Sequence, residues 1–190
     1  MAQVSSVIPV ALDRMEQVVK NSFNWRGAQD ASMHAEIGFG PQALVITGEI
    51  HDDYPLVQSR LRPLTEDWWQ IGYGADGVQL DFDDPSSATR QLRLLFNFSS
   101  AGTNPQLEVL QSPTGVKSNP APGSELRVEE LPDSARQQGT NGFKFRAVLP
   151  VEKLAEPSFF SGPLRIVTRL HDLDGDYSTY LMMQDVLEKP

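Results

Sequence analysis

Two adjacent tryptophans, Trp68 and Trp69, are the side chains whose type and spacing point most directly to ligand binding. Neighbouring side chains of a β-strand face opposite sides, so one indole can enter the core while the other must face outward. An outward indole is a flat apolar plate on which the C–H face of a sugar ring can stack, and large exposed apolar surface usually marks a binding site. The sequence therefore predicts a carbohydrate site at this pair. Further ring candidates are Trp25, Tyr54 and Tyr73, although Trp25 could equally belong to the core.

The densest acidic segment holds Asp172, Asp174 and Asp176. Alternating aspartates can supply hard oxygen ligands to Ca²⁺, so these three residues are the predicted metal ligands. The EF-hand pattern is not met, because the twelfth position counted from Asp172 is Met183 and not glutamate. Asp174-Gly175 also suits a two-residue hairpin turn, so a turn without calcium is the alternative to a turn with calcium.

Two histidines, His51 and His171, each end an apolar run and precede an aspartate. The runs 46–53 and 166–172 resemble each other, as two strands with equivalent places in two sheets would. Imidazole and carboxylate together suit a transition metal, so a metal site is conceivable if these strand ends meet. Histidines at strand ends are more often surface residues or residues with satisfied hydrogen bonds, and that alternative stays open.

Patterns that indicate catalysis are weaker. The strand-turn-helix nucleophile elbow Gly-x-Ser-x-Gly is absent from the sequence. Paired carboxylates could serve glycoside hydrolysis, but the acidic clusters fall at predicted strand ends and turns, where aspartate also caps and solubilises. We therefore expect a non-catalytic protein.

The composition limits the partners and the compartment. The chain of 190 residues has a formal net charge of -9, which repels phosphate backbones and anionic lipid headgroups, so nucleic acid and membrane surfaces are poor partners. It has no cysteine, which excludes disulfides and thiolate metal sites. No apolar run reaches the roughly 20 residues of a membrane helix, so no membrane insertion is expected. No signal peptide is visible at the start, which leaves a cytoplasmic protein or the mature segment of an exported one.

Alternating apolar residues dominate the chain and predict about nine or ten short strands separated by turn signals. This pattern is typical of an all-β, antiparallel, jelly-roll-like β-sandwich, and we expect one domain over residues 1–190. The clearest hairpin joins the alternating runs 33–39 and 44–50 across Gly40-Pro41. Two turns of helix could follow Asp13 up to Asn21, and a short turn is expected at 151–155 after Pro150.

Five segments, in this order, resemble the family-nine carbohydrate-binding modules and the wider DOMON-like group of β-sandwiches. They cover most of residues 20–185, and each is individually a weak motif. The segments are 23–32 with its Trp and Asp-x-Ser, 43–53 ending in His-Asp-Asp, 74–83 with Asp-x-Val-x-Leu, 143–154 with its Pro and short turn, and 164–176 ending in Asp-x-Asp-Gly.

The resemblance implies an extracellular module, secreted, periplasmic or on the cell surface, that holds poly- or oligosaccharide beside a tethered glycan-processing enzyme. It also implies structural calcium and a sugar site built on tryptophan rings with polar groups around them. Two alternatives remain. The sandwich could be a structural or protein-interaction domain that has lost the sugar site, or a haem-binding domain of the same broad group, with Met or His as axial ligands.

Overall fold

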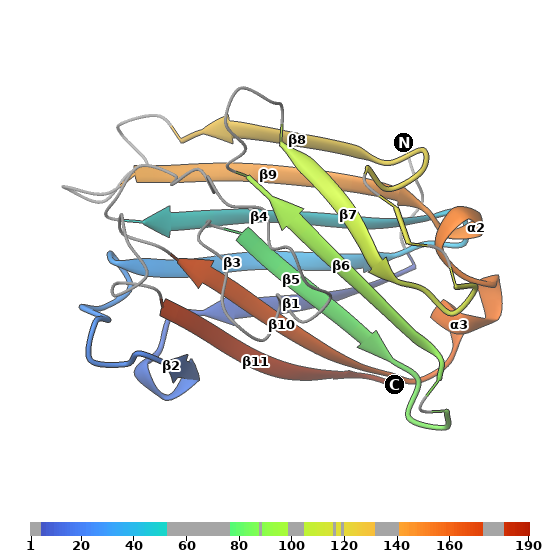
Figure 1. The fold of residues 1–190 in the computed structure, drawn as a ribbon, viewed down its shortest axis with the longest axis horizontal. Coiled ribbons are helices and arrows are strands. Elements are labelled where there is room, and N and C mark those ends of the chain that lie inside the picture. The colour runs from blue at the N-terminus through green and yellow to red at the C-terminus, as the bar shows by residue number, and fades with distance from the viewer. Residues whose placement is uncertain are drawn as a thin grey trace.

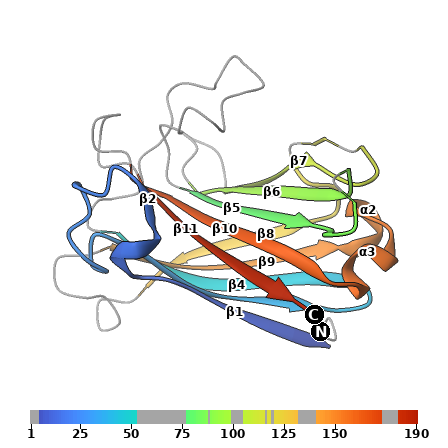
Figure 2. The same cartoon turned by 90° about the horizontal axis from the view of Figure 1, so that it is seen from below.

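The computed structural model describes residues 5–52, 77–87, 89–98, 105–115, 117–118, 120–131, 141–172 and 181–190. Within these residues the chain forms two antiparallel sheets that pack face to face, which confirms the predicted all-β sandwich (Figures 1 and 2). The five-stranded sheet has the order β1-β3-β4-β9-β8, and the six-stranded sheet has the order β2-β11-β10-β5-β6-β7. Four of the nine strand pairs, β1-β3, β4-β9, β2-β11 and β5-β10, join strands that are not consecutive in the chain, so the fold combines hairpins with long-range pairing.

The described strands of the five-stranded sheet are β1 (Ser6–Leu12), β3 (Ala31–Phe39), β4 (Ala43–Asp52), β8 (Glu125–Glu130) and β9 (Asn141–Pro150). Those of the six-stranded sheet are β2 (Val18–Lys20), β5 (Gly77–Asp83), β6 (Gln91–Asn97), β7 (Gln106–Gln111), β10 (Leu164–Asp172) and β11 (Leu181–Lys189). The described helical elements are the 3-10 turn η1 (Met15–Gln17) and the helices α2 (Val151–Leu154) and α3 (Pro157–Ser161).

One hydrophobic core lies between the sheets, and the alternation of each strand explains it. In β3, for example, Met33, Ala35 and Ile37 are buried while His34 and Glu36 between them are exposed. Successive side chains of a strand face opposite sides, so a strand that alternates apolar and polar residues buries one face and leaves the other in water. The predicted hairpin is confirmed, since Ile37 of β3 pairs with Ile46 of β4 in the register.

The helices α2 and α3 lie at one end of the sandwich (Figures 1 and 2). Helix α2 confirms the short turn predicted after Pro150, and α3 follows it with Pro157 in its first turn. Phe160 of α3 packs against Phe39 and Phe82, with ring centroids 6.3 and 6.2 Å away. These aromatic contacts bridge both sheets and cover the core at this end.

The predicted helix from Asp13 to Asn21 is wrong. Only the 3-10 turn η1 forms there, and strand β2 follows it directly. The buried side chain of Gln17 explains the difference: its carbonyl oxygen accepts the backbone N–H groups of Asp13 and Arg14, and its amide donates to the Ala11 carbonyl and to Asp185. These bonds tie the segment to β1 and β11, and tertiary contacts of this kind override a weak helical pattern.

A nearly buried polar cluster lies on the outward side of the six-stranded sheet. The Asp81 carboxylate, 8% exposed, accepts a hydrogen bond from Arg169 at 2.5 Å and lies 3.2 Å from the Arg93 Nε. The Gln79 amide donates to the same carboxylate at 2.9 Å. Desolvation, followed by the negative charge of Asp81, raises the pKa of the adjacent Asp83 carboxyl. The negative charge of Asp81 therefore compensates the positive charges of Arg93 and Arg169 on this face.

Candidate functional site

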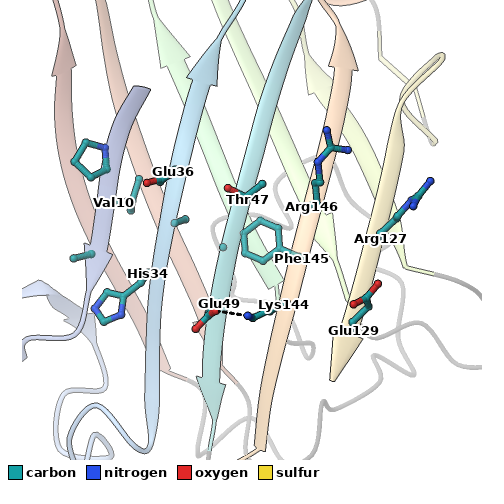
Figure 3. Close-up of a pocket in the computed structure, with 14 residues that line it drawn as sticks. Val10, His34, Glu36, Thr47, Glu49, Arg127, Glu129, Lys144, Phe145 and Arg146 are labelled. Carbon is teal, nitrogen blue, oxygen red and sulfur yellow. Dashed lines mark ion pairs between the residues drawn. The ribbon is translucent and has the colours of Figure 1, made fainter. Parts of the chain in front are cut away.

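A groove of about 740 Å³ lies on the outward side of the five-stranded sheet (Figure 3). Its volume falls within the roughly 300–1,000 Å³ of typical small-molecule sites. Every strand of this sheet contributes to its lining. The polar lining residues are His34, Glu36, Thr47, Glu49, Arg127, Glu129, Lys144 and Arg146, and the others are Pro9, Val10, Ala11, Ala35, Gly48 and Phe145.

The strand register arranges the outward side chains in two rows that cross the sheet. The first row runs through Ala11, His34, Glu49, Lys144 and Glu129. The second row runs through Pro9, Glu36, Thr47, Arg146 and Arg127. Directly opposed residues have Cβ atoms about 4.5–5.5 Å apart, so from β3 to β8 the rows form a continuous band of hydrogen-bond donors and acceptors. Such a band can bind the hydroxyl groups of a ligand that lies across the strands.

The charged groups of the groove remain largely accessible to a ligand. Lys144 forms an ion pair with Glu49 at 2.9 Å, where the two side chains are 56% and 45% exposed (Figure 3). His34 contacts Asp13 at 2.9 Å at the edge of the sheet. Exposed pairs of this kind contribute only about 0–1 kcal/mol, so a ligand can exchange partners with them at little cost.

Gly48 lies in the middle of the sheet because the core beneath it has no room for a side chain. A Cβ atom there would lie 2.6 Å from the Phe145 ring and 2.9 Å from the Cβ of Ala35. The Phe145 ring is 3% exposed and packs against Phe96 and Phe98, so it faces the core. Among the described lining residues, Phe145 is the only phenylalanine, tyrosine or tryptophan, so the one exposed aromatic ring that these residues supply is the imidazole of His34.

The structure describes two of the predicted site residues. Trp25 is partly buried against the core, and its indole N–H donates to the Ala31 carbonyl at 3.1 Å. Asp172 is buried, 3% exposed, at the end of β10. The other predicted residues lie outside the described ranges, so the ring sites and the calcium site stay predictions. Those residues are Tyr54, Trp68, Trp69, Tyr73, Asp174 and Asp176.

The two His-Asp strand ends do meet. His51 and Asp52 at the end of β4 line the same small cavity as His171 and Asp172 at the end of β10. Strands β4 and β10 belong to different sheets, which agrees with their similar sequences. The cavity measures about 10 Å³, about the space of one water molecule. In the part of the chain that the structure describes, no three histidine or acidic side chains are grouped to share a metal ion.

His171 is a buried neutral base at this junction. Its burial, followed by the positive charges of Arg169 and Lys20, lowers the pKa of the imidazole to about 4. A neutral imidazole could ligate a metal, but its burial at a junction between the two sheets equally suits a structural role.

Sequence reasoning did not find the groove. Its residues are the polar members of alternating strands, and such positions are polar in every sheet with one solvated face. The unusual feature of the groove is that Arg127 lies directly opposite Arg146. The sequence does not show this, because it depends on the register of β8 with β9.

The fold and the groove define a β-sandwich with an open polar face, and the comparison with solved structures agrees with the sandwich fold. A crystal structure of a candidate carbohydrate-binding protein from Bacteroides uniformis ATCC 8492 is similar, with a TM-score of 0.53 and 10% sequence identity. The match covers 97% of this chain and 80% of that one, so the two share a fold over nearly the whole sandwich. No protein-family model and no curated protein matches the chain. In the described residues, no helix is long and apolar enough to cross a membrane.

Proposed function

We propose that this protein is a non-catalytic module that binds poly- or oligosaccharide in the groove of the five-stranded sheet. The observation that carries the proposal is the band of outward donors and acceptors that crosses strands β3, β4, β9 and β8 in a groove of about 740 Å³. Sugars present closely spaced hydroxyl groups, and side chains held in rows by a sheet can bind several of them at once.

Two further observations support the same function. The fold is like that of a candidate carbohydrate-binding protein, and five segments of the sequence resemble family-nine carbohydrate-binding modules. Trp68 and Trp69 are predicted to add a ring on which a sugar can stack. A binding module of this kind acts in the extracellular space, the periplasm or the cell surface by concentrating a tethered enzyme near its polysaccharide.

We expect Thr47→Met to weaken glycan binding at least about tenfold, or about 1.4 kcal/mol. Thr47 lies in the centre of the groove, and methionine removes its hydroxyl and fills the space above Gly48. The measurement is calorimetric titration with the oligosaccharides that a glycan array identifies. The matched control is Val45→Met, because Val45 faces outward from the same strand but lies outside the groove lining.

If Thr47→Met binds the glycan as tightly as the unmodified protein, the glycan site does not lie in the groove. If Trp68→Ala and Trp69→Ala then abolish binding while thermal unfolding is unaffected, the site is at the tryptophans. If no glycan binds the unmodified protein at millimolar concentration, the proposed function is wrong.

We also propose that Asp172 contributes to a calcium site together with Asp174 and Asp176. Buried carboxylates are the hard oxygen ligands that Ca²⁺ prefers, and Asp52 lines the same cavity as Asp172. Calcium that binds only the folded protein raises its midpoint of thermal unfolding, by an amount that grows with the calcium concentration. We expect a higher midpoint in millimolar CaCl₂ than in EDTA, and a smaller difference for Asp174→Asn. Equal midpoints in both buffers would contradict the site.

A further inference from the structure

We propose that the groove recognises a negatively charged sugar unit, whose acidic group binds between Arg146 of β9 and Arg127 of β8. This inference rests on the proposed function and specifies its ligand. A uronate carboxylate and a sulfate ester are acidic groups that sugars carry, and two oxygens of either group can accept the parallel N–H donors of a guanidinium.

The first support is the register. Arg127 and Arg146 are directly opposed in the pairing of β8 with β9. Like charges at opposed positions of adjacent strands destabilise a sheet, and an anion bound between the two arginines would offset their repulsion. Figure 3 shows both guanidinium groups turned away from the Glu49–Lys144 ion pair. The chain as a whole carries a formal net charge of -9, so this cationic pair is a local exception.

The second support is the lack of strong counter-charges. Arg127 has a contact of 3.8 Å with Glu125, and the two side chains are 72% and 65% exposed. Within the described residues, Arg146 forms no ion pair or hydrogen bond through its guanidinium. Lys144, which also lies on β9, forms an ion pair with Glu49 at 2.9 Å. The donors of the arginine pair therefore remain available to an anion.

The third support is the position of the pair in the groove. Thr47 lies opposite Arg146 on β4, and Glu36 lies opposite Thr47 on β3. An acidic group held between the arginines would place its sugar ring over Thr47 and Gly48. The hydroxyl groups of that ring would then face Glu36 and Glu49, which can accept hydrogen bonds from them. The β8–β9 end of the groove thus suits the acidic group of the ligand, and the β3–β4 end suits its hydroxyl groups.

The test compares an acidic oligosaccharide with its neutral counterpart. Oligogalacturonate and its methyl ester have the same sugar backbone, and only the first is charged; dextran sulfate and dextran form the sulfate pair. We expect the unmodified protein to bind at least one acidic probe at least tenfold more tightly than its neutral counterpart. Arg146→Gln should reduce that preference at least tenfold, and Arg127→Gln should reduce it as well. Tighter binding of dextran sulfate that Arg146→Gln abolishes would support the inference and identify the acidic group as a sulfate.

The control is Arg165→Gln, which removes an arginine that is 50% exposed on the other sheet. It should leave the preference unchanged. Without ligand, Arg146→Gln should keep or raise the midpoint of thermal unfolding, because it removes the repulsion from Arg127; a merely structural role would lower it. Equal binding of the acidic and neutral probes, unaffected by Arg146→Gln, overturns this inference and leaves the proposed function standing. Binding of no glycan at all overturns both.

Discussion

Asp81→Asn is expected to lower the free energy of unfolding by about 3 kcal/mol at pH 7, the largest effect of any single carboxylate that we predict. The Asp81 side chain is 8% exposed and lies between Arg93 and Arg169, which are each 22% exposed. Asparagine keeps the size but removes the negative charge, so two poorly solvated guanidinium groups lose their counter-charge. Breaking such a pair is strongly destabilising because it leaves uncompensated charge away from water.

Urea unfolding of the two proteins at the same pH measures the difference. The matched control is Glu49→Gln, the same chemical change in the exposed ion pair with Lys144. That change should alter the free energy of unfolding by less than about 1 kcal/mol. If the two variants lose similar amounts, the cluster around Asp81 is not the stabilising feature that its burial indicates.

Acid is expected to destabilise the protein through His171 in the window between pH 6.5 and about 4. In the folded protein, burial keeps this imidazole neutral down to a pKa of about 4, whereas its ordinary pKa is 6.5. Below pH 6.5 the unfolded chain binds a proton that the folded protein does not, so stability falls as the pH falls. The difference of about 2.5 between the two pKa values corresponds to about 3 kcal/mol lost on reaching pH 4.

Arg169 on its own strand and Lys20 on β2 disfavour protonation of His171, and His51, Asp52 and Asp172 are the titratable residues that line its cavity. The residues opposite His171 in the register are Gly77 and Met182, which do not titrate. The free energy of unfolding of His171→Gln, measured from pH 7 to pH 4, should therefore fall by about 3 kcal/mol less than that of the unmodified protein. His34→Gln removes an exposed histidine and should retain the steep fall. Parallel pH profiles for His171→Gln and the unmodified protein would show that His171 is not the source.

Several features of the fold were predictable from the sequence because they are local. Alternation along a strand decides which side chains face the core, and in β5 the alternating apolar residues Val78, Leu80 and Phe82 share one buried face. The turn signal Gly40-Pro41 lies between the paired strands β3 and β4. The edge strand β1 lies outside the segments that the sequence analysis singled out.

The sequence by itself determined the class of fold, the buried face of most strands and the chemistry of individual candidate residues. Only the tertiary structure decided which of those residues become neighbours. It brought His51 and Asp52 to the cavity of His171 and Asp172, and it placed Arg127 opposite Arg146. The physical reason is that alternation belongs to one strand at a time. The partner and register of each strand instead depend on how all eleven described strands together bury the core.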